Sequence, residues 1–252
     1  MKNILITGGS GKVGFQLLKH FLANGLNVIT TSTNKNRFLT EKKNELTEEQ
    51  FDKLKIIEVN FNDSDAENII LNFLDFHKIS ITDIIHNARS LEFLKIDDDK
   101  SISNRNFAGE FYIDVIFPYR LTLAIKNKSD NELANIIFIS SMYGVVGPTP
   151  SLYEDFENSS PIHYGVCKAA QIHLTKELAV RLAPKIRVNC VSFGGIKGRT
   201  DSEFEKRYLN LTPQKKMLID EDVIGPVDYL ISENSKNMTG QNLKVDGGWT
   251  IW

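Results

Sequence analysis

Tyr164 and Lys168 lie four residues apart in a segment with helical spacing, downstream of the pair Ser140 and Ser141. Residues four apart on a helix project from one face, so the ammonium can lie beside the phenol and favour the phenolate. A tyrosine in that setting can act as an acid or base near neutral pH. The same spacing is common on solvated helices, so the chemistry depends on the elements that position these residues.

Size and composition predict one soluble domain over residues 1–252, since 41% of the chain is hydrophobic and 25% is charged. A net charge of -2 gives no reason to expect nucleic acid or an anionic membrane as partner. No apolar run reaches membrane-spanning length, and the first residues enter a strand rather than a signal peptide, which predicts a cytoplasmic protein. Cys167 and Cys190 fit neither a disulfide framework nor a metal set, and we expect both to be buried.

Short apolar runs alternate with segments of helical spacing along the whole chain. This alternation predicts an α/β, doubly wound Rossmann fold with a seven-stranded parallel sheet and helices on both faces. Ligands of such sheets bind beyond the carboxyl ends of the strands. Residues 34–50 are expected to form a solvated helix and loop, and residues 198–217 a lid. The expected strands are 4–6, 28–31, 55–59, 84–86, 136–139, 187–191 and 243–245.

A glycine-rich turn follows the first strand and opens the first helix. Its glycines are Gly8, Gly11 and Gly14. Glycine allows the backbone to turn tightly and approach a pyrophosphate, whose charge is received by the amides and the positive dipole of the helix N-terminus. In this strand, turn and helix context, dinucleotide binding is favoured over a simple connection.

The end of the second strand indicates which nicotinamide cofactor is preferred. An NAD site usually has an acidic residue here, but this chain has hydroxyls at Ser32 and Thr33, cations at Lys35 and Arg37, and Lys12 in the glycine loop. Such groups can accept a 2'-phosphate, which an aspartate would repel. We therefore expect NADP in preference to NAD. Solvated loop charges remain an equal alternative for Lys35 and Arg37 taken singly.

Over nearly its whole length the chain resembles the short-chain dehydrogenase/reductases of the compact, single-domain type. Beyond the glycine loop and Tyr164 with Lys168, the resemblance rests on Asn87 with Ala88 and on Ser141 after the fifth strand. It continues through the segments 186–192 and 238–249. It implies hydride transfer between a nicotinamide and a substrate carbon.

The resemblance also implies roles for individual residues. Tyr164 is the general acid or base, Lys168 assists it and holds the nicotinamide ribose, and Ser141 bonds the reacting oxygen. Ser140 is then a strand residue. The implied cofactor contacts are Gly8, Ser10, Gly11, Lys12, Val13, Gly14, Ser32, Thr33, Asn60, Phe61, Asn87, Ala88, Arg89, Tyr164, Lys168, Gly194 and Ile196.

Four features depart from the family pattern. The spacing of the loop glycines is more typical of extended members, Arg89 replaces a glycine, and Phe193 replaces a proline. Asp114 occupies the place of the asparagine that completes the catalytic tetrad. Paired with Lys168, it would weaken the support for the phenolate, so we expect activity with an alkaline-shifted pH profile. Alternatively, Asp114 caps or kinks its helix without catalytic effect.

The chain also resembles a narrower branch described as flagellin modification protein A, which is associated with bacterial surface-glycan pathways. Residues 148–157 lengthen the segment before Tyr164, and Tyr153 and Phe156 would either contact a sugar or nucleotide-sugar substrate or anchor this loop. His163 either lines the pocket or is a structural residue at a helix start. No metal is expected, since the histidine spacing does not argue for one.

The resemblance implies a homodimer or homotetramer in which the C-terminal Trp249 and Trp252 pack across an interface. Two alternatives to a simple oxidoreductase remain open. One is a sugar epimerase or dehydratase that retains its nicotinamide, and the other is a cofactor-binding protein without catalysis.

Overall fold

The computed structural model describes residues 2–198 and 200–252. It contains one sheet of seven parallel strands in the order β3-β2-β1-β4-β5-β6-β7, which confirms the expected fold class. All seven expected strands are present, with ends shifted by one or two residues. Their bounds are β1 (Asn3–Ile6), β2 (Asn27–Ser32), β3 (Leu54–Glu58), β4 (Asp83–His86), β5 (Asn135–Ser141), β6 (Arg187–Phe193) and β7 (Asn242–Val245).

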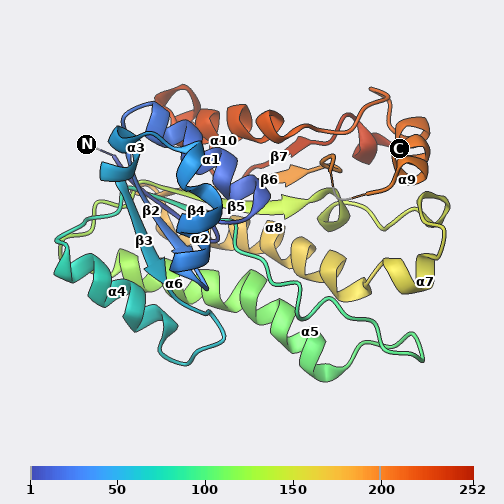
Figure 1. Ribbon diagram of the computed structural model, residues 1–252, viewed down its shortest axis with the longest axis horizontal. Helices are drawn as coiled ribbons and strands as arrows, with labels where there is room; N and C mark the ends of the chain where they lie inside the picture. Colours follow the sequence, from blue (N-terminus) through green and yellow to red (C-terminus); the bar gives the residue numbers. More distant parts are fainter. Residues whose placement is uncertain (1, 199) are drawn as a thin grey trace.

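Helices cover both faces of the sheet (Figure 1). On one face lie α1 (Lys12–Ala23) and α10 (Ile224–Ile231), and on the other α4 (Ala66–Phe76), α6 (Phe117–Lys126) and α8 (Ile162–Leu182). The remaining helices are α2 (Lys35–Lys42), α3 (Glu48–Asp52), α5 (Asn104–Phe111), α7 (Phe156–Ser159) and α9 (Ser202–Leu211), with the short turns η1 (Lys43–Glu45), η2 (Tyr112–Ile116), η3 (Met142–Gly144), η4 (Pro150–Leu152), η5 (Asp220–Val223), η6 (Glu233–Ser235) and η7 (Trp249–Ile251).

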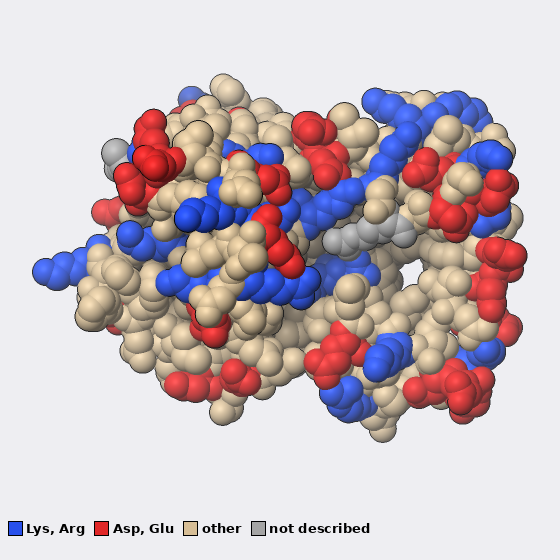
Figure 2. Space-filling view, viewed as in Figure 1, with Lys and Arg blue, Asp and Glu red and all other residues tan. Residues whose placement is uncertain are grey.

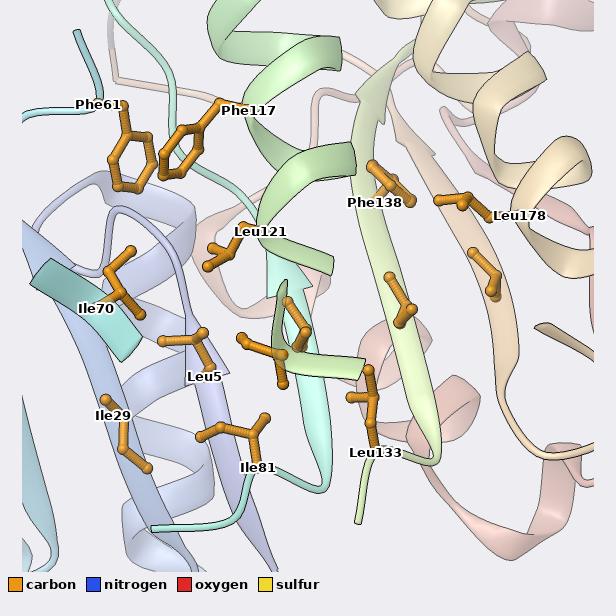
Figure 3. Packing of buried hydrophobic residues seen from close by; sticks show 14 of the residues in the cluster. Leu5, Ile29, Phe61, Ile70, Ile81, Phe117, Leu121, Leu133, Phe138 and Leu178 are labelled. Atoms are coloured by element: carbon orange, nitrogen blue, oxygen red, sulfur yellow. The ribbon is translucent and has the colours of Figure 1, made fainter. Parts of the chain in front are cut away.

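The core consists of two apolar layers, one on each face of the sheet. Figure 3 shows the layer beneath α4, α6 and α8, where Leu5 and Ile29 of the strands face Ile70 and Leu121 of the helices. Such continuous apolar strands are expected in a parallel sheet that is buried on both faces. At the edge of this layer the rings of Phe61 and Phe117 stack with centroids 3.9 Å apart.

The chain changes direction across the sheet between β1 and β4. From β1 it moves outward through β2 to β3, and then returns to add β4 on the other side of β1. The loops that leave the carboxyl ends of β1 and β4 therefore diverge, and the crevice between them is where parallel α/β sheets bind ligands. The glycine loop and the Asn87 segment lie at this crevice.

The exposure of the two cysteines and of the two C-terminal tryptophans was also predicted from the sequence. Cys167 and Cys190 are buried, as expected. The prediction that Trp249 would be an exposed interface residue is wrong, because its ring stacks on Tyr208 of α9 at a centroid distance of 4.6 Å and only 4% of it is exposed. Trp252 is 76% exposed.

Residues 34–50 contain α2, η1 and α3, which agrees with the expected solvated helix and loop. The proposed lid over residues 198–217 contains α9, although Arg199 of this segment lies outside the described residues. Across 2–198 and 200–252, no helix combines the length and apolarity needed to span a bilayer.

Candidate functional site

The glycine loop is folded so tightly that two of its glycines cannot carry a side chain. Gly8 has φ +70°, and a Cβ there would lie 2.8 Å from the Cα of Ala88. A Cβ on Gly14 would lie 2.4 Å from the carbonyl oxygen of Gly8 and 2.6 Å from Nδ2 of Asn87. These contacts bring the first turn of α1 against the end of β4, so the glycines are needed for packing at the crevice.

Asn87 and Thr7 tie the loops after β1 and β4 together. The Asn87 amide donates to the carbonyl oxygens of Thr7 and Gly8 at 3.1 and 3.2 Å, while the Thr7 hydroxyl accepts from the backbone N–H groups of Asn87 and Ala88. Gly11, the N-cap of α1, has no side chain with which to cap the helix. The amide groups and positive dipole at the N-terminus of α1 can therefore receive an anion, so these residues fit the pyrophosphate of a dinucleotide.

A cleft of about 830 Å³ runs from the glycine loop to Tyr164, within the usual range of ligand pockets. Among its lining residues are Gly8, Ser10, Gly11, Lys12, Val13, Ser32, Thr33, Asn60, Phe61, Asn87, Ala88, Arg89, Ser141, Tyr164, Lys168, Gly194 and Ile196. Sequence reasoning named all of these. Gly14 and Asp114, which it also named, are not part of the lining and lie behind it. On the face shown in Figure 2, Lys and Arg side chains form a band across the middle, beside a hollow in the surface.

The expected phosphate contacts are only partly available. The Lys12 ammonium pairs with Asp220 at 2.9 Å and donates to the Lys197 carbonyl. Arg37 lines the cleft, but its Nε donates to Glu41 at 2.7 Å. Lys35 does not line the cleft. A 2'-phosphate would therefore compete with carboxylates for the charged groups, while the hydroxyls of Ser32 and Thr33 lie in the cleft lining.

Ser141 and Tyr164 come together because the turn after β5 packs directly on α8. A Cβ on Gly144 would lie 2.7 Å from the Lys168 carbonyl carbon, so only glycine allows this approach. The Ser141 hydroxyl accepts from the Tyr143 N–H at 3.2 Å, and the Ser140 hydroxyl donates to the Lys168 carbonyl at 2.9 Å. Ser140 thus joins β5 to α8, in keeping with its expected role as a strand residue.

Lys168 is buried, and its ammonium lies 3.1 Å from each carboxylate oxygen of Asp114. It also donates to Oε1 of Gln171 at 3.2 Å and lies 5.7 Å from the centroid of the Tyr164 ring. Burial, the largest single effect, favours the neutral amine, but Asp114 together with Tyr164 and Glu110 more than offsets it, so the pKa of Lys168 is raised. Lys168 is therefore a fixed cation beside the phenol.

Asp114 occupies a widened π-helical turn, η2, for a reason visible in the sequence. Pro118 has no N–H to donate to the Asp114 carbonyl four residues earlier, so the regular helical bond is lost. The Gln171 amide donates to that carbonyl instead, at 2.8 Å. The turn thus orients the Asp114 side chain toward Lys168 and does more than kink the helix.

Two residues of this buried group were not predicted from the sequence as site residues. Gln171 lies three residues after Lys168 on α8, and Glu110 lies four residues before Asp114 on α5. Both are almost fully buried. Their helical spacing from a named site residue is a signal that could have found them. The guanidinium of Arg89 lies 4.9 Å from the centroid of the Tyr164 ring, as a cation over an aromatic face.

The residues of the inserted segment mainly anchor it. The Tyr153 hydroxyl is 2.5 Å from that of Tyr143, and its ring contacts those of Phe156 and Phe204 at centroid distances of 5.8 Å. Burial, followed by the proximity of the Tyr153 phenol, raises the pKa of Tyr143. His163 is buried with Nε2 2.7 Å from the Phe93 carbonyl, so it is a structural residue.

Comparison with known proteins agrees with this geometry. A family model described as enoyl-(acyl carrier protein) reductase matches residues 10–250. The chain is 30% identical to the post-translational flagellin modification protein A of Campylobacter coli, over 99% of this chain and 98% of that one. It is 27% identical to a ribulose-forming D-arabinitol 2-dehydrogenase of Candida albicans, over 100% and 93% of the two chains.

A solved structure with a similar fold is a short-chain dehydrogenase from Leptospira borgpetersenii with bound NAD+. Its TM-score is 0.84 and its sequence is 29% identical, with 99% of this chain and 92% of that chain covered. Together with the family model, these matches confirm the resemblance expected from the motifs. The chain belongs to the short-chain dehydrogenase/reductases, a family of NAD(P)-dependent oxidoreductases.

Proposed function

We propose that the protein interconverts a secondary alcohol and a ketone on a sugar or nucleotide-sugar metabolite, with NADP preferred over NAD. The observation that carries this proposal is the single cleft that joins the glycine loop to Ser141, Tyr164 and Lys168. Cofactor cradle and proton-transfer group thus face the same space. The nicotinamide, when bound, supplies the hydride chemistry.

The residues of the chain then manage the proton. In alcohol oxidation the Tyr164 phenolate accepts the hydroxyl proton, and in ketone reduction the phenol donates it to the carbonyl oxygen. The Ser141 hydroxyl lies in the same lining and can donate to that oxygen as charge develops on it. Lys168 stabilises the phenolate from the side, because its ammonium is held 5.7 Å from the ring centroid.

A polyhydroxylated substrate is supported by the relatives and by the lining of the cleft. One similar protein is an arabinitol dehydrogenase and another is a flagellin modification protein. Arg89, Ser90 and Glu92 add donors and acceptors to the lining of the same cleft, and these suit hydroxyl groups. The proposal includes a role of this reaction in bacterial surface-glycan synthesis.

We also propose that the protein is a homodimer or homotetramer. Apolar side chains on α5, η2, α6 and α8 are partly exposed, among them Phe107, Ile116, Tyr119 and Val166 at 37 to 44%. Light scattering at micromolar concentration tests this, and a monomer mass would contradict it.

The function is tested by titrating the protein with NADPH and NADH separately while following nicotinamide fluorescence, and then by screening keto-sugars for NADPH oxidation. Tighter binding of NADPH and turnover of a keto-sugar are expected. Tighter binding of NADH would contradict the cofactor preference. A cofactor that stays bound through purification, with no net turnover of NADPH, would instead favour an epimerase or dehydratase. Cofactor binding without turnover that Tyr164→Phe leaves unchanged would favour a cofactor-binding protein without catalysis.

A further inference from the structure

Glu110 is a buried acid with no partner. Its side chain is 1% exposed, and neither carboxyl oxygen has a hydrogen-bond partner within the described residues. A carboxylate in such surroundings has lost its hydration without compensation, whereas the neutral acid loses far less. The position therefore favours a carboxyl group that holds its proton.

The charges around Glu110 come from three directions. Asp114 lies four residues later in η2, which directly follows α5, and α8 contributes the Lys168 ammonium and the neutral thiol of Cys167. Arg89 approaches from the segment after β4. Burial and then Asp114 raise the pKa of Glu110 to about 7, against the opposing effects of Lys168 and Arg89.

None of these cations is a dedicated partner for Glu110. The Lys168 ammonium is engaged by Asp114, Gln171 and, at 3.4 Å, the Ile139 carbonyl. The Arg89 guanidinium lies over the Tyr164 ring.

Two other titratable groups lie on α8. His163 directs Nε2 to the Phe93 carbonyl, and burial raises the pKa of Cys167, which favours the neutral thiol. Two buried carboxyl groups, on Glu110 and Asp114, thus share one buried ammonium.

A change of charge at Glu110 reaches Tyr164 through this cluster. Lys168 is coupled electrostatically to both carboxyl groups and to Tyr164. Buried charges are poorly screened by salt, so a new negative charge near Lys168 opposes formation of the phenolate.

We infer that Glu110 is a positioning residue for the proton chemistry at Tyr164, because its ionisation adds a negative charge to the buried group around Lys168 and moves phenolate formation to higher pH. The significance for catalysis rests on the proposed function, but the ionisation itself does not. When Glu110 ionises, one proton leaves its carboxylic acid for solvent and a carboxylate remains. No other bond changes.

The experiment is a tyrosinate titration by ultraviolet absorbance, without cofactor or substrate. The signal of Tyr164 is isolated by subtracting the curve of Tyr164→Phe made in each background. Glu110→Gln and Glu110→Met both remove the acid, the second without introducing a polar group that needs a partner. Glu132→Gln is the matched control, since Glu132 is an exposed glutamate outside the site.

Both Glu110 variants are expected to form the Tyr164 phenolate about one pH unit lower than wild type, and Glu132→Gln is expected to match wild type. Coincident curves for Glu110→Gln and wild type would overturn the inference. The titration measures no turnover. A lack of oxidoreductase activity would contradict the proposed function, but it would not affect the titration result for Glu110.

Discussion

The ammonium of Lys168 lies 3.1 Å from both carboxylate oxygens of Asp114, and Gln171 fixes this pair by donating to the Asp114 carbonyl. In the family pattern an asparagine stands at this position. We propose that the negative charge of Asp114 opposes the phenolate that Lys168 would otherwise support, and that the pair thereby shifts the pH range of the reaction.

Asp114→Asn removes that charge and keeps the size of the side chain. We expect alcohol oxidation by the variant to reach half its maximal rate at a pH about one unit lower than wild type. A pH-rate curve with saturating cofactor measures this. Superimposable curves would mean that Asp114 serves only to hold Lys168 in place.

Glu110 makes stability depend on pH. Its pKa is about 7 in the folded protein and 4.5 ordinarily, so its contribution is fully present below pH 4.5 and is lost as pH rises to 7. The loss amounts to about 3 kcal/mol. Part of this loss has already occurred at pH 5, so between pH 5 and pH 7.5 the unfolding free energy of wild type should fall by about 2 kcal/mol more than that of Glu110→Gln. Denaturant unfolding at the two pH values measures this, and identical trends would refute the shift.

Gly14→Ala should destroy the cofactor site. The added Cβ meets the Gly8 carbonyl oxygen at 2.4 Å, so the glycine loop has to move, at a cost of about 1–3 kcal/mol. We expect a lower unfolding midpoint and no NADPH binding. Gly147→Ala is the control, because nothing lies within 4 Å of its Cβ, and it should behave as wild type. Normal NADPH binding by Gly14→Ala would be evidence against the assigned site.

Glu41→Gln tests whether Arg37 can contact a 2'-phosphate. Glu41 now engages the Arg37 guanidinium at 2.7 Å in an exposed ion pair, which is worth little energy. Releasing Arg37 should tighten NADPH binding about two- to fivefold and leave NADH binding unchanged. Fluorescence titrations with the two cofactors give both constants, and an equal effect on both would exclude a role for Arg37.

Sequence alone predicted the sheet because seven apolar runs buried on both faces leave few other arrangements. It also predicted most residues of the cleft lining, since glycine spacing and strand-end motifs are local signals. The direct contact of Asp114 with Lys168 was anticipated only as a pairing. The missing N–H of Pro118 is visible in the sequence, but the donor that replaces it, the Gln171 amide, is found only when α8 lies alongside.

Burial of a side chain by segments far away in the chain could not be predicted from the sequence. Trp249 is covered because Tyr208 of α9 stacks on it, and no local pattern links the two. The Glu110 side chain is likewise buried because α5 packs near α8. Lys12 and Arg37 were expected to be free to bind a phosphate. Lys12 instead pairs with Asp220 of η5, and Arg37 pairs with Glu41 one helical turn later.

The most direct test is keto-sugar reduction by Tyr164→Phe, with Tyr229→Phe of the exposed surface of α10 as control. We predict that Tyr164→Phe binds NADPH as wild type does and loses turnover by about 10²–10⁴-fold, while Tyr229→Phe keeps full activity. Turnover by Tyr164→Phe within a few-fold of wild type would contradict the account, because the proton would then come from another group.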